Sequence, residues 1–161
     1  MSPVMDFSEP VEPQLELIAR FRVTLGEPLE LGQTQWGRRR VIPIAGGEFE
    51  GPRLRGKVIP GGADWQVVHT DGMATIDTRY TLQADDGSLI SVATNGVRDG
   101  PPEVLARLAR GEPVDPAVYY FRVAIRYETS AAKHAWLNRI LAIASAIRLA
   151  DEVIYDAYAV R

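Results

Sequence analysis

The sequence predicts an all-β fold in which antiparallel strands follow one another as a meander. Glycine-containing turns divide the stretch from Pro60 to Arg98 into three short segments rich in strand-forming residues. Apolar and polar residues alternate over Gln14–Leu25 and again over Tyr119–Ser130, which indicates two further strands. A chain of 161 residues, 46% of them hydrophobic, has the size and composition of one globular domain.

The N-terminal part of the chain predicts an arm followed by strands. Residues 1–13 contain three prolines and little apolar surface, so we expect a flexible arm that precedes a single domain spanning residues 14–161. After the first strand, at Gln14–Leu25, we expect a loop around Trp36, a strand over Arg39–Ala45, a turn at Gly46-Gly47 and a strand over residues 51–57.

The three turns of the central meander are expected at Gly61-Gly62, Asp71-Gly72 and Asp86-Gly87. Beyond the meander, the sequence VLARLARG at 104–111 has helical spacing and a glycine stop, which predicts one short helix. The segment from Lys133 to Arg161 suits either one helix of about 20 residues or two strands. Its periodicity favours a helix over Trp136–Leu149, and its composition favours a strand over Val153–Val160.

Composition excludes several classes of function. The net charge of −3 offers no general attraction to nucleic acid or to an anionic membrane surface. With no cysteine and two histidines, we expect no metal site and no cofactor. The N-terminus lacks the basic patch and apolar run of a signal peptide, and no apolar run is long enough for a membrane span, so we expect a cytoplasmic protein. The oligomeric state stays open between a monomer and a homo-oligomer.

Two short patterns resemble ion-binding loops without completing them. GPRLRGK at 51–57 matches part of a phosphate-binding loop, but Val58 replaces the hydroxyl residue and Pro60 prevents the helix that should follow. Asp85 and Asp86 resemble the start of a calcium loop that lacks its later ligands, so a hairpin turn explains them better. Neither pattern predicts an ion site.

The chain resembles the bacterial and fungal family known as domain of unknown function 3237, or uncharacterised protein family 0311. The residues that carry the resemblance are GGEFEGPRLRG at 46–56, PGGADW at 60–65, the run at 71–80 ending in RY, DDGSLI at 85–90, NGVR at 95–98, YFR at 120–122, YET at 127–129 and WLN at 136–138. The resemblance implies a closed, lipocalin-like antiparallel β-barrel and therefore two strands at the C-terminus. A barrel suits the expected eight to ten strands, because closure removes free strand edges.

The candidate catalytic residues are carboxylates and one arginine. Asp77 and Arg79 are two residues apart, so they share one face of a strand, either as a pair inside the barrel or as a salt bridge outside. Asp64 and Glu128 are further candidates for the proton-transferring acid. We expect at least one of Asp64, Asp77 and Glu128 to have a raised pKa and to line the same pocket as an ionised one, because an apolar barrel interior disfavours the charged form.

The candidate ligand-binding residues are aromatic, amide and cationic side chains near these carboxylates. They are Trp65, Tyr80, Asn95, Arg122, Trp136 and Asn138. We expect Asp77, Arg79, Arg122 and Asn138 to point into one cavity.

Two functions fit a barrel with such a polar interior. One is a cofactor-independent acid/base enzyme of the isomerase, cyclase or lyase type, acting on a small apolar oxygenated molecule. The other is a binding or carrier protein that holds a small molecule without reacting it. Both need the same pocket, so the sequence does not separate them.

Overall fold

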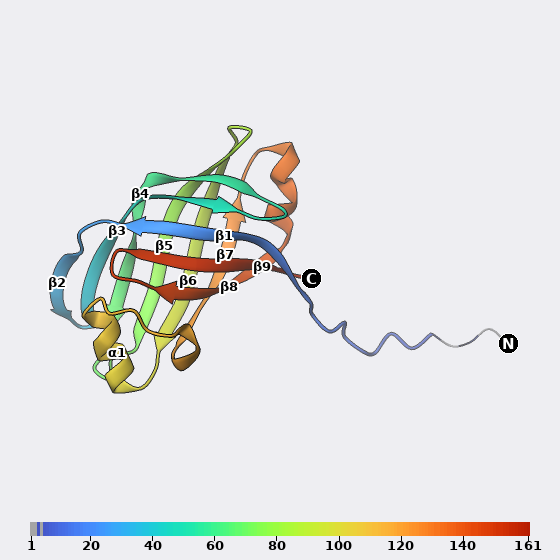
Figure 1. The fold of residues 1–161 in the computed structure, drawn as a ribbon. Helices are drawn as coiled ribbons and strands as arrows, with labels where there is room; N and C mark the ends of the chain where they lie inside the picture. The colour runs from blue at the N-terminus through green and yellow to red at the C-terminus, as the bar shows by residue number, and fades with distance from the viewer. Residues whose placement is uncertain (1–2, 4) are drawn as a thin grey trace.

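The computed structural model describes residue 3 and residues 5–161, and in this part of the chain the strands close into an antiparallel β-barrel (Figure 1). The strands are β1 Leu15–Leu25, β2 Leu29–Thr34, β3 Gly37–Glu50, β4 Arg55–Val68, β5 Ala74–Ala84, β6 Leu89–Asp99, β7 Tyr120–Glu128, β8 Leu141–Arg148 and β9 Glu152–Val160. From β3 to β9 each strand pairs with the next, and β1 closes the ring between β9 and β3. Strand β2 pairs only with β3, outside the ring.

The predicted fold class is confirmed: the protein is an all-β barrel with few short helices. Helix α1, Pro102–Ala109, occupies the position predicted for the short helix, and two 3-10 helices lie at Pro116–Val118 and Ala132–Arg139. The C-terminus forms two strands, so the helix expected over Trp136–Leu149 is wrong beyond Arg139. The outer face of β8 carries apolar residues such as Leu141 and Ile143, which makes this strand look helical by periodicity, whereas β9 confirms the strand predicted over Val153–Val160.

Two of the predicted turns are bulges inside long strands. At Gly46-Gly47 and Gly61-Gly62 the chain continues in β3 and β4, and the pairing register shifts there. Gly62 has φ of 78°, and a Cβ on it would lie 2.0 Å from the Arg79 carbonyl oxygen. The glycines let the strands bend around the barrel with the neighbouring backbone close by. The turns at Asp71-Gly72 and Asp86-Gly87 are confirmed.

Two expectations for the N-terminal half also need correction. The expected loop around Trp36 contains strand β2, which forms a hairpin with β3. The strand expected over residues 51–57 begins only at Arg55, because the chain turns between β3 and β4 at residues 51–54.

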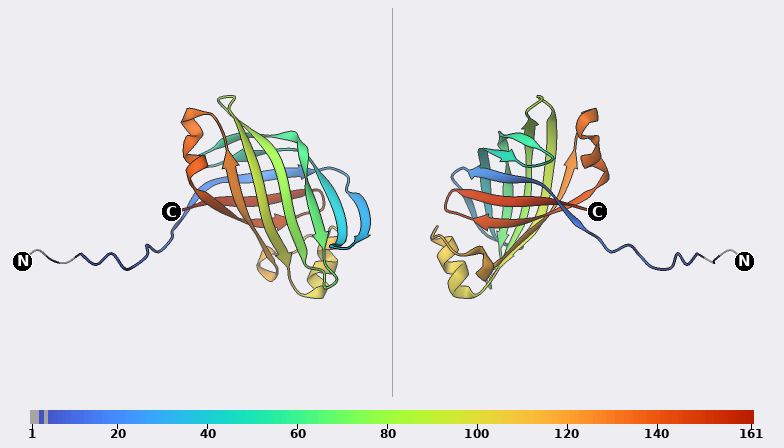
Figure 2. Two further views of the ribbon diagram at one scale, coloured as in Figure 1. Left: turned by 180° about the vertical axis from the view of Figure 1, so that it is seen from behind. Right: turned by 45° about the vertical axis from the view of Figure 1, so that its right-hand side comes forward.

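The N-terminal segment lies outside the barrel. Residues 5–13 are exposed, form no helix or strand and extend away from the barrel (Figure 2). The predicted arm also includes residues 1, 2 and 4, which lie outside the described residues. Gln14 and Arg161 exchange two backbone hydrogen bonds of 2.8 Å, which hold the start of β1 beside the end of β9. Among the helices that the structure describes, none is long and apolar enough to cross a membrane.

The core fills one end of the barrel and leaves space toward the other. Phe21 on β1 is fully buried and stacks against Phe49 and Tyr155, with ring centroids 4.9 and 4.7 Å away. The 3-10 helix Ala132–Arg139 packs Leu137 into this core at one end, and α1 packs Val104 and Leu108 near the opposite end (Figure 1). Between the aromatic core and the α1 end lies a cavity.

Candidate functional site

The cavity inside the barrel has mostly apolar walls. Water-sized molecules can place their centres in about 60 Å³ of it, which is room for a few waters or part of a compact ligand. Its apolar lining consists of inward-facing residues from β1, β3, β5, β7, β8 and β9: Val23, Leu25, Ile42, Ile44, Ile76, Phe121, Val123, Ala146, Val153. The polar lining residues are few, so each has a large influence on what the cavity binds.

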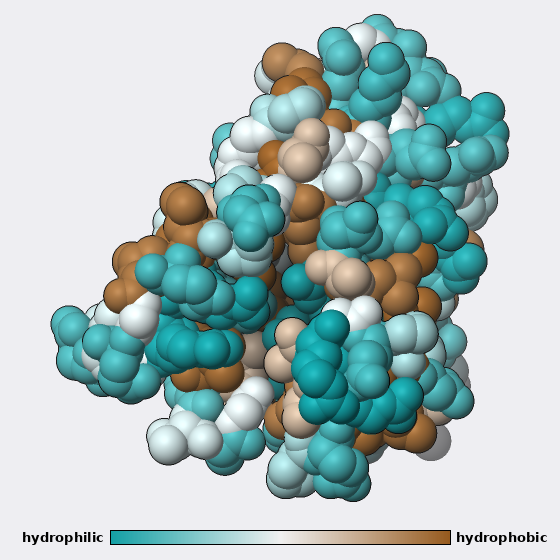
Figure 3. Space-filling model, turned by 60° about the vertical axis from the view of Figure 1, so that its left-hand side comes forward, coloured by the Kyte–Doolittle hydropathy of each residue, from teal (hydrophilic) through white to brown (hydrophobic). Residues whose placement is uncertain are grey.

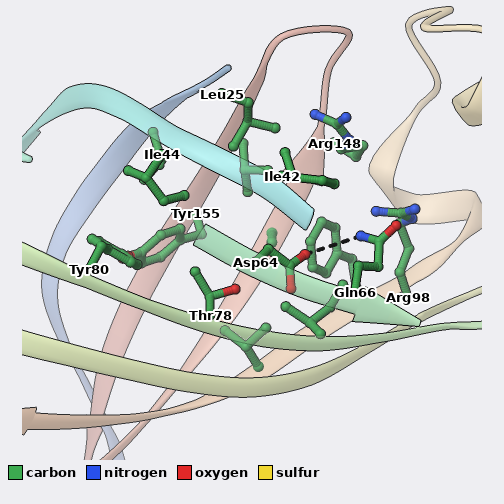
Figure 4. Close-up of a pocket in the computed structure, with 16 residues that line it drawn as sticks. Leu25, Ile42, Ile44, Asp64, Gln66, Thr78, Tyr80, Arg98, Arg148 and Tyr155 are labelled. Carbon is green, nitrogen blue, oxygen red and sulfur yellow. Dashed lines mark hydrogen bonds between the residues drawn. The ribbon is translucent and has the colours of Figure 1, made fainter. Parts of the chain in front are cut away.

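Asp64 on β4 places a carboxyl group in this apolar wall (Figure 4). The side chain is only 8% exposed. Its Oδ1 accepts a hydrogen bond of 3.0 Å from the backbone N–H of Asp77, and its Oδ2 accepts one of 3.1 Å from Nε2 of Gln66. Gln66 lies two residues further along β4 and is itself buried, so the strand's alternation directs both side chains inward.

Burial raises the pKa of the Asp64 carboxyl above its usual value. The hydrogen bonds from the Asp77 backbone and Gln66, the positive charge of Arg98 and the Thr78 hydroxyl act in the opposite direction but do not cancel it. Asp64 therefore fulfils the expectation that one of the three candidate carboxyls has a raised pKa, but Asp77 and Glu128 are exposed and do not line the same pocket. A carboxyl of this kind holds its proton to higher pH than an exposed one does and can serve as a proton donor or acceptor.

Two arginines line the cavity on the side away from the aromatic core. Arg98 on β6 and Arg148 at the end of β8 lie beyond Gln66 when the cavity is followed from its tyrosine end (Figure 4). Burial, together with the like charge of Arg148, lowers the pKa of Arg98 to about 10, so the guanidinium stays protonated at neutral pH. Burial also lowers the pKa of Arg148, with a contribution from Arg40.

Tyrosine hydroxyls form the inner end of the cavity. Tyr80 on β5 and Tyr155 on β9 are hydrogen-bonded to each other through their hydroxyl groups. Burial raises the pKa of both, so both remain neutral and can share hydrogen bonds with a ligand oxygen. The hydroxyl of Tyr127 on β7 is buried without a hydrogen-bond partner among the described residues.

The prediction that Asp77, Arg79, Arg122 and Asn138 point into one cavity is wrong. On β5 the residues Ile76, Thr78 and Tyr80 are buried, so Asp77 and Arg79 alternate outward and are exposed. No ion pair joins them in the described part of the chain. Only the backbone N–H of Asp77 reaches the site, through its hydrogen bond to Asp64.

The same alternation places four other candidates outside the cavity. On β7 the buried face is Phe121, Val123, Ile125 and Tyr127, so Arg122 and Glu128 are exposed. Asn95 on β6 is exposed, and Trp65 on β4 points away from its neighbours Asp64 and Gln66 with 40% of its surface accessible. Of the ten candidate residues, the cavity lining contains Asp64 and Tyr80.

Trp136 and Asn138 have structural positions at the closed end of the barrel. The Trp136 ring packs against the core and has the guanidinium of Arg53 at 4.1 Å from its centroid. Asn138 accepts a hydrogen bond of 2.9 Å from the Thr129 N–H and donates one of 2.8 Å to the Thr129 carbonyl. These contacts hold the link between β7 and the 3-10 helix. The positions of Trp136 and Asn138 therefore do not support the predicted roles of these two residues in ligand binding.

The site residues that the sequence did not indicate are Gln66, Thr78, Arg98, Arg148 and Tyr155. The sequence contains a signal for Gln66 and Thr78. Gln66 is two residues from Asp64, and Thr78 is two residues from Tyr80, so each lies on the same strand face as a predicted site residue. No group of three or more His, Cys, Asp or Glu residues suited to a metal occurs among the described residues. The cavity therefore offers one carboxyl, two guanidiniums and tyrosine hydroxyls as its reactive groups.

We predict that Asp64 makes the protein less stable as the pH rises. The folded state holds the Asp64 proton to higher pH than the unfolded chain does, so the free energy of unfolding falls as pH rises from about 3.8 through the folded pKa. In Asp64→Asn this loss should disappear, whereas Asp77→Asn should keep it. Urea unfolding from pH 4 to pH 8, with carbon-detected NMR of the carboxyls, measures both quantities. An Asp64 that titrates at or below the usual Asp value would contradict the prediction.

The comparisons with known proteins agree with the barrel. Residues 13–160 match the family described as "Protein of unknown function (DUF3237)". A UPF0311 protein of Rhodopseudomonas palustris is 41% identical over 150 residues, which covers 92% of this chain and 98% of that protein. The crystal structure of a beta-barrel like protein from Acinetobacter baumannii is similar with a TM-score of 0.85 and 49% identity, covering 96% of this chain and 99% of that one.

A more distant relative has an enzymatic name. The "Hydroalkoxylation enzyme phnH" of Penicillium herquei is 27% identical over 135 residues, which covers 84% of this chain and 75% of that protein. The crystal structure of an enzyme from Penicillium herquei has the same fold, with a TM-score of 0.71 at 23% identity, covering 96% of this chain and 98% of that one. The family match over almost the whole barrel, together with the identity to the UPF0311 protein, shows that this chain belongs to the DUF3237 family.

Proposed function

We propose that this protein is an acid/base enzyme that works without a metal or redox cofactor on a small, largely apolar, oxygenated molecule bound in the barrel. The observation that carries the proposal is the Asp64 carboxyl, which is buried in an apolar wall, has a raised pKa and borders the cavity. Isomerisation, cyclisation, hydration and elimination need a proton shuttle and a shaped, water-poor pocket, and this cavity offers both.

The hydrogen bonds of Asp64 suit a proton shuttle. The Asp77 N–H and the Gln66 amide hold the carboxyl in one orientation in either protonation state. A fixed carboxyl loses little conformational freedom when it meets a reacting atom. The tyrosine hydroxyls at one end of the cavity and the guanidiniums at the other can hydrogen-bond substrate oxygens and stabilise negative charge that develops on them.

The fungal relative suggests one specific reaction within this class. A hydroalkoxylation adds the O–H bond of an alcohol across a carbon–carbon double bond. Ionised Asp64 would accept the hydroxyl proton while the oxygen forms its bond to carbon, and protonated Asp64 would return that proton to the neighbouring carbon. One carboxyl then suffices, because the proton removed equals the proton added and no electron donor or acceptor is needed.

The proposal is tested with hydroxy enones of increasing size, ending with ortho-hydroxychalcone. These compounds close to cyclic ethers with a new stereocentre, and the uncatalysed reaction gives a racemic product. We expect the wild-type protein to produce an enantiomeric excess from at least one of them, measured by chiral chromatography. Racemic products formed at the background rate throughout the panel would reject ring closure as the reaction.

A carrier is the second candidate, because the cavity borders a wide mouth that would let a ligand enter and leave unchanged. For a carrier, Asp64 would only orient the ligand, and enones that bind would be recovered unreacted. The partner in either case is a small molecule, and a cytoplasmic location remains a prediction.

A further inference from the structure

The cavity around Asp64 continues into a wider mouth at the α1 end of the barrel. Arg98 and Arg148 line both spaces, so they lie where the mouth narrows into the cavity. Figure 3 brings this end of the barrel forward and shows hydrophilic residues gathered around a hollow. The mouth is also lined by Arg38, Arg40 and Arg110, and by a single acidic residue, Asp71.

The two arginines at the narrowing have no carboxylate partner in the described part of the chain. Arg40 is paired with Glu30 at 2.8 Å, and Arg110 with Glu112 at 2.8 Å, but neither Arg98 nor Arg148 takes part in an ion pair. Nη1 of Arg148 is buried and has no hydrogen-bond partner among residue 3 and residues 5–161. Arg98 lies over the Phe121 ring, with 5.6 Å to its centroid, and its guanidinium forms no hydrogen bond with another described residue.

The carboxylates near Arg98 and Arg148 form no ion pair with either guanidinium in the described part of the chain. Asp64 attracts both guanidiniums from inside the cavity and Asp151 attracts Arg148 from the β8–β9 turn, whereas the like charge of Arg40 acts against both. Buried charge without a hydrogen-bonded partner is costly, so proteins keep it where a ligand supplies the partner. Two guanidiniums at one narrowing present planar sets of donors, a geometry that matches a carboxylate.

We propose that the substrate carries a carboxylate, which binds Arg98 and Arg148 at the narrowing while the apolar part of the molecule extends to Asp64. The substrate class is thus a small apolar carboxylic acid that also contains the hydroxyl or double bond on which Asp64 acts. This inference rests on the proposed function only for the reacting group, since the binding of the carboxylate does not require any reaction.

The test uses a saturated acid that cannot react, hydrocinnamate, and its neutral analogue, hydrocinnamamide. Isothermal titration calorimetry should show the acid binding the wild-type protein about tenfold or more tightly than the amide. Arg98→Gln should weaken acid binding by about ten- to hundredfold and leave amide binding within about twofold. Arg122→Gln is the matched control, because it removes the same charge from the outer face of β7.

Each outcome decides the proposal. Equal binding of acid and amide, no binding of the acid, or equal weakening by Arg98→Gln and Arg122→Gln would overturn it. If Arg98→Gln does not fold by circular dichroism, Arg148→Gln replaces it with the same expectation. Asp64→Asn should bind the acid at least as tightly as the wild type. The binding of the carboxylate can therefore be tested separately from the enzymatic proposal, even if that proposal fails.

Discussion

Asp64→Asn is expected to slow the stereoselective ring closure by about 100- to 10,000-fold, the range that general acid/base catalysis contributes. The substitution keeps the shape of the side chain but removes its ability to accept and return a proton. The amide oxygen can still accept the hydrogen bond from the Asp77 N–H, and the amide N–H₂ can donate to Gln66 after that side chain flips. The fold should therefore survive, and the enantiomeric excess of the product should fall to zero.

Asp77→Asn is the control for this experiment. It makes the same chemical change at a residue next to Ile76 but on the exposed face of β5, so the rate should stay within about twofold of the wild type. A loss of activity in Asp77→Asn comparable to that in Asp64→Asn would move the proton shuttle away from the cavity. An active Asp64→Asn with unchanged stereoselectivity would also end the assignment of Asp64.

The strand content was predictable because it depends on local patterns. Alternation identified β1 and β7, and glycine turns identified the hairpins around β5. Closure of the barrel was not visible in any local pattern, since β1 pairs with β9 and β3, which lie far away in sequence. It followed from the resemblance to the family. The glycine pairs at 46–47 and 61–62 were misread as turns, because a glycine pair permits a turn or a bulge equally.

Most of the candidate residues lie outside the cavity, because the prediction took the charged side chains of each strand to face inward. Arg79 and Tyr80 are adjacent on β5 and cannot both face the cavity. Tyr80 shares its face with Ile76 and Leu82, and burying this apolar face outweighs burying Asp77 and Arg79. The same rule would have turned Arg122 and Glu128 outward on β7. Arg98 and Arg148 could not be placed together from the sequence, because they come from β6 and β8, which β7 separates, and both line the cavity only in the folded barrel.

Phe21→Ala is expected to destabilise the protein by about 3–5 kcal/mol, the usual cost of removing a fully buried phenyl ring. The ring is stacked between Phe49 and Tyr155, so its removal opens a void and breaks two aromatic contacts. Tyr155 lines the cavity, and losing its support should also loosen the hydroxyl pair with Tyr80. Urea unfolding followed by tryptophan fluorescence measures the free energy of unfolding.

The matched control is Phe7→Ala, which removes the same ring from a residue that is 82% exposed in the N-terminal segment. Because that ring buries little surface, the free energy of unfolding should change by no more than about 0.5 kcal/mol. If Phe21→Ala cost less than about 1 kcal/mol, the stacked aromatic cluster would not be a main source of stability, and the closed end of the barrel would have to be held by other contacts. If ligand binding weakened in Phe21→Ala but not in Phe7→Ala, the link from the cluster through Tyr155 to the cavity would be supported.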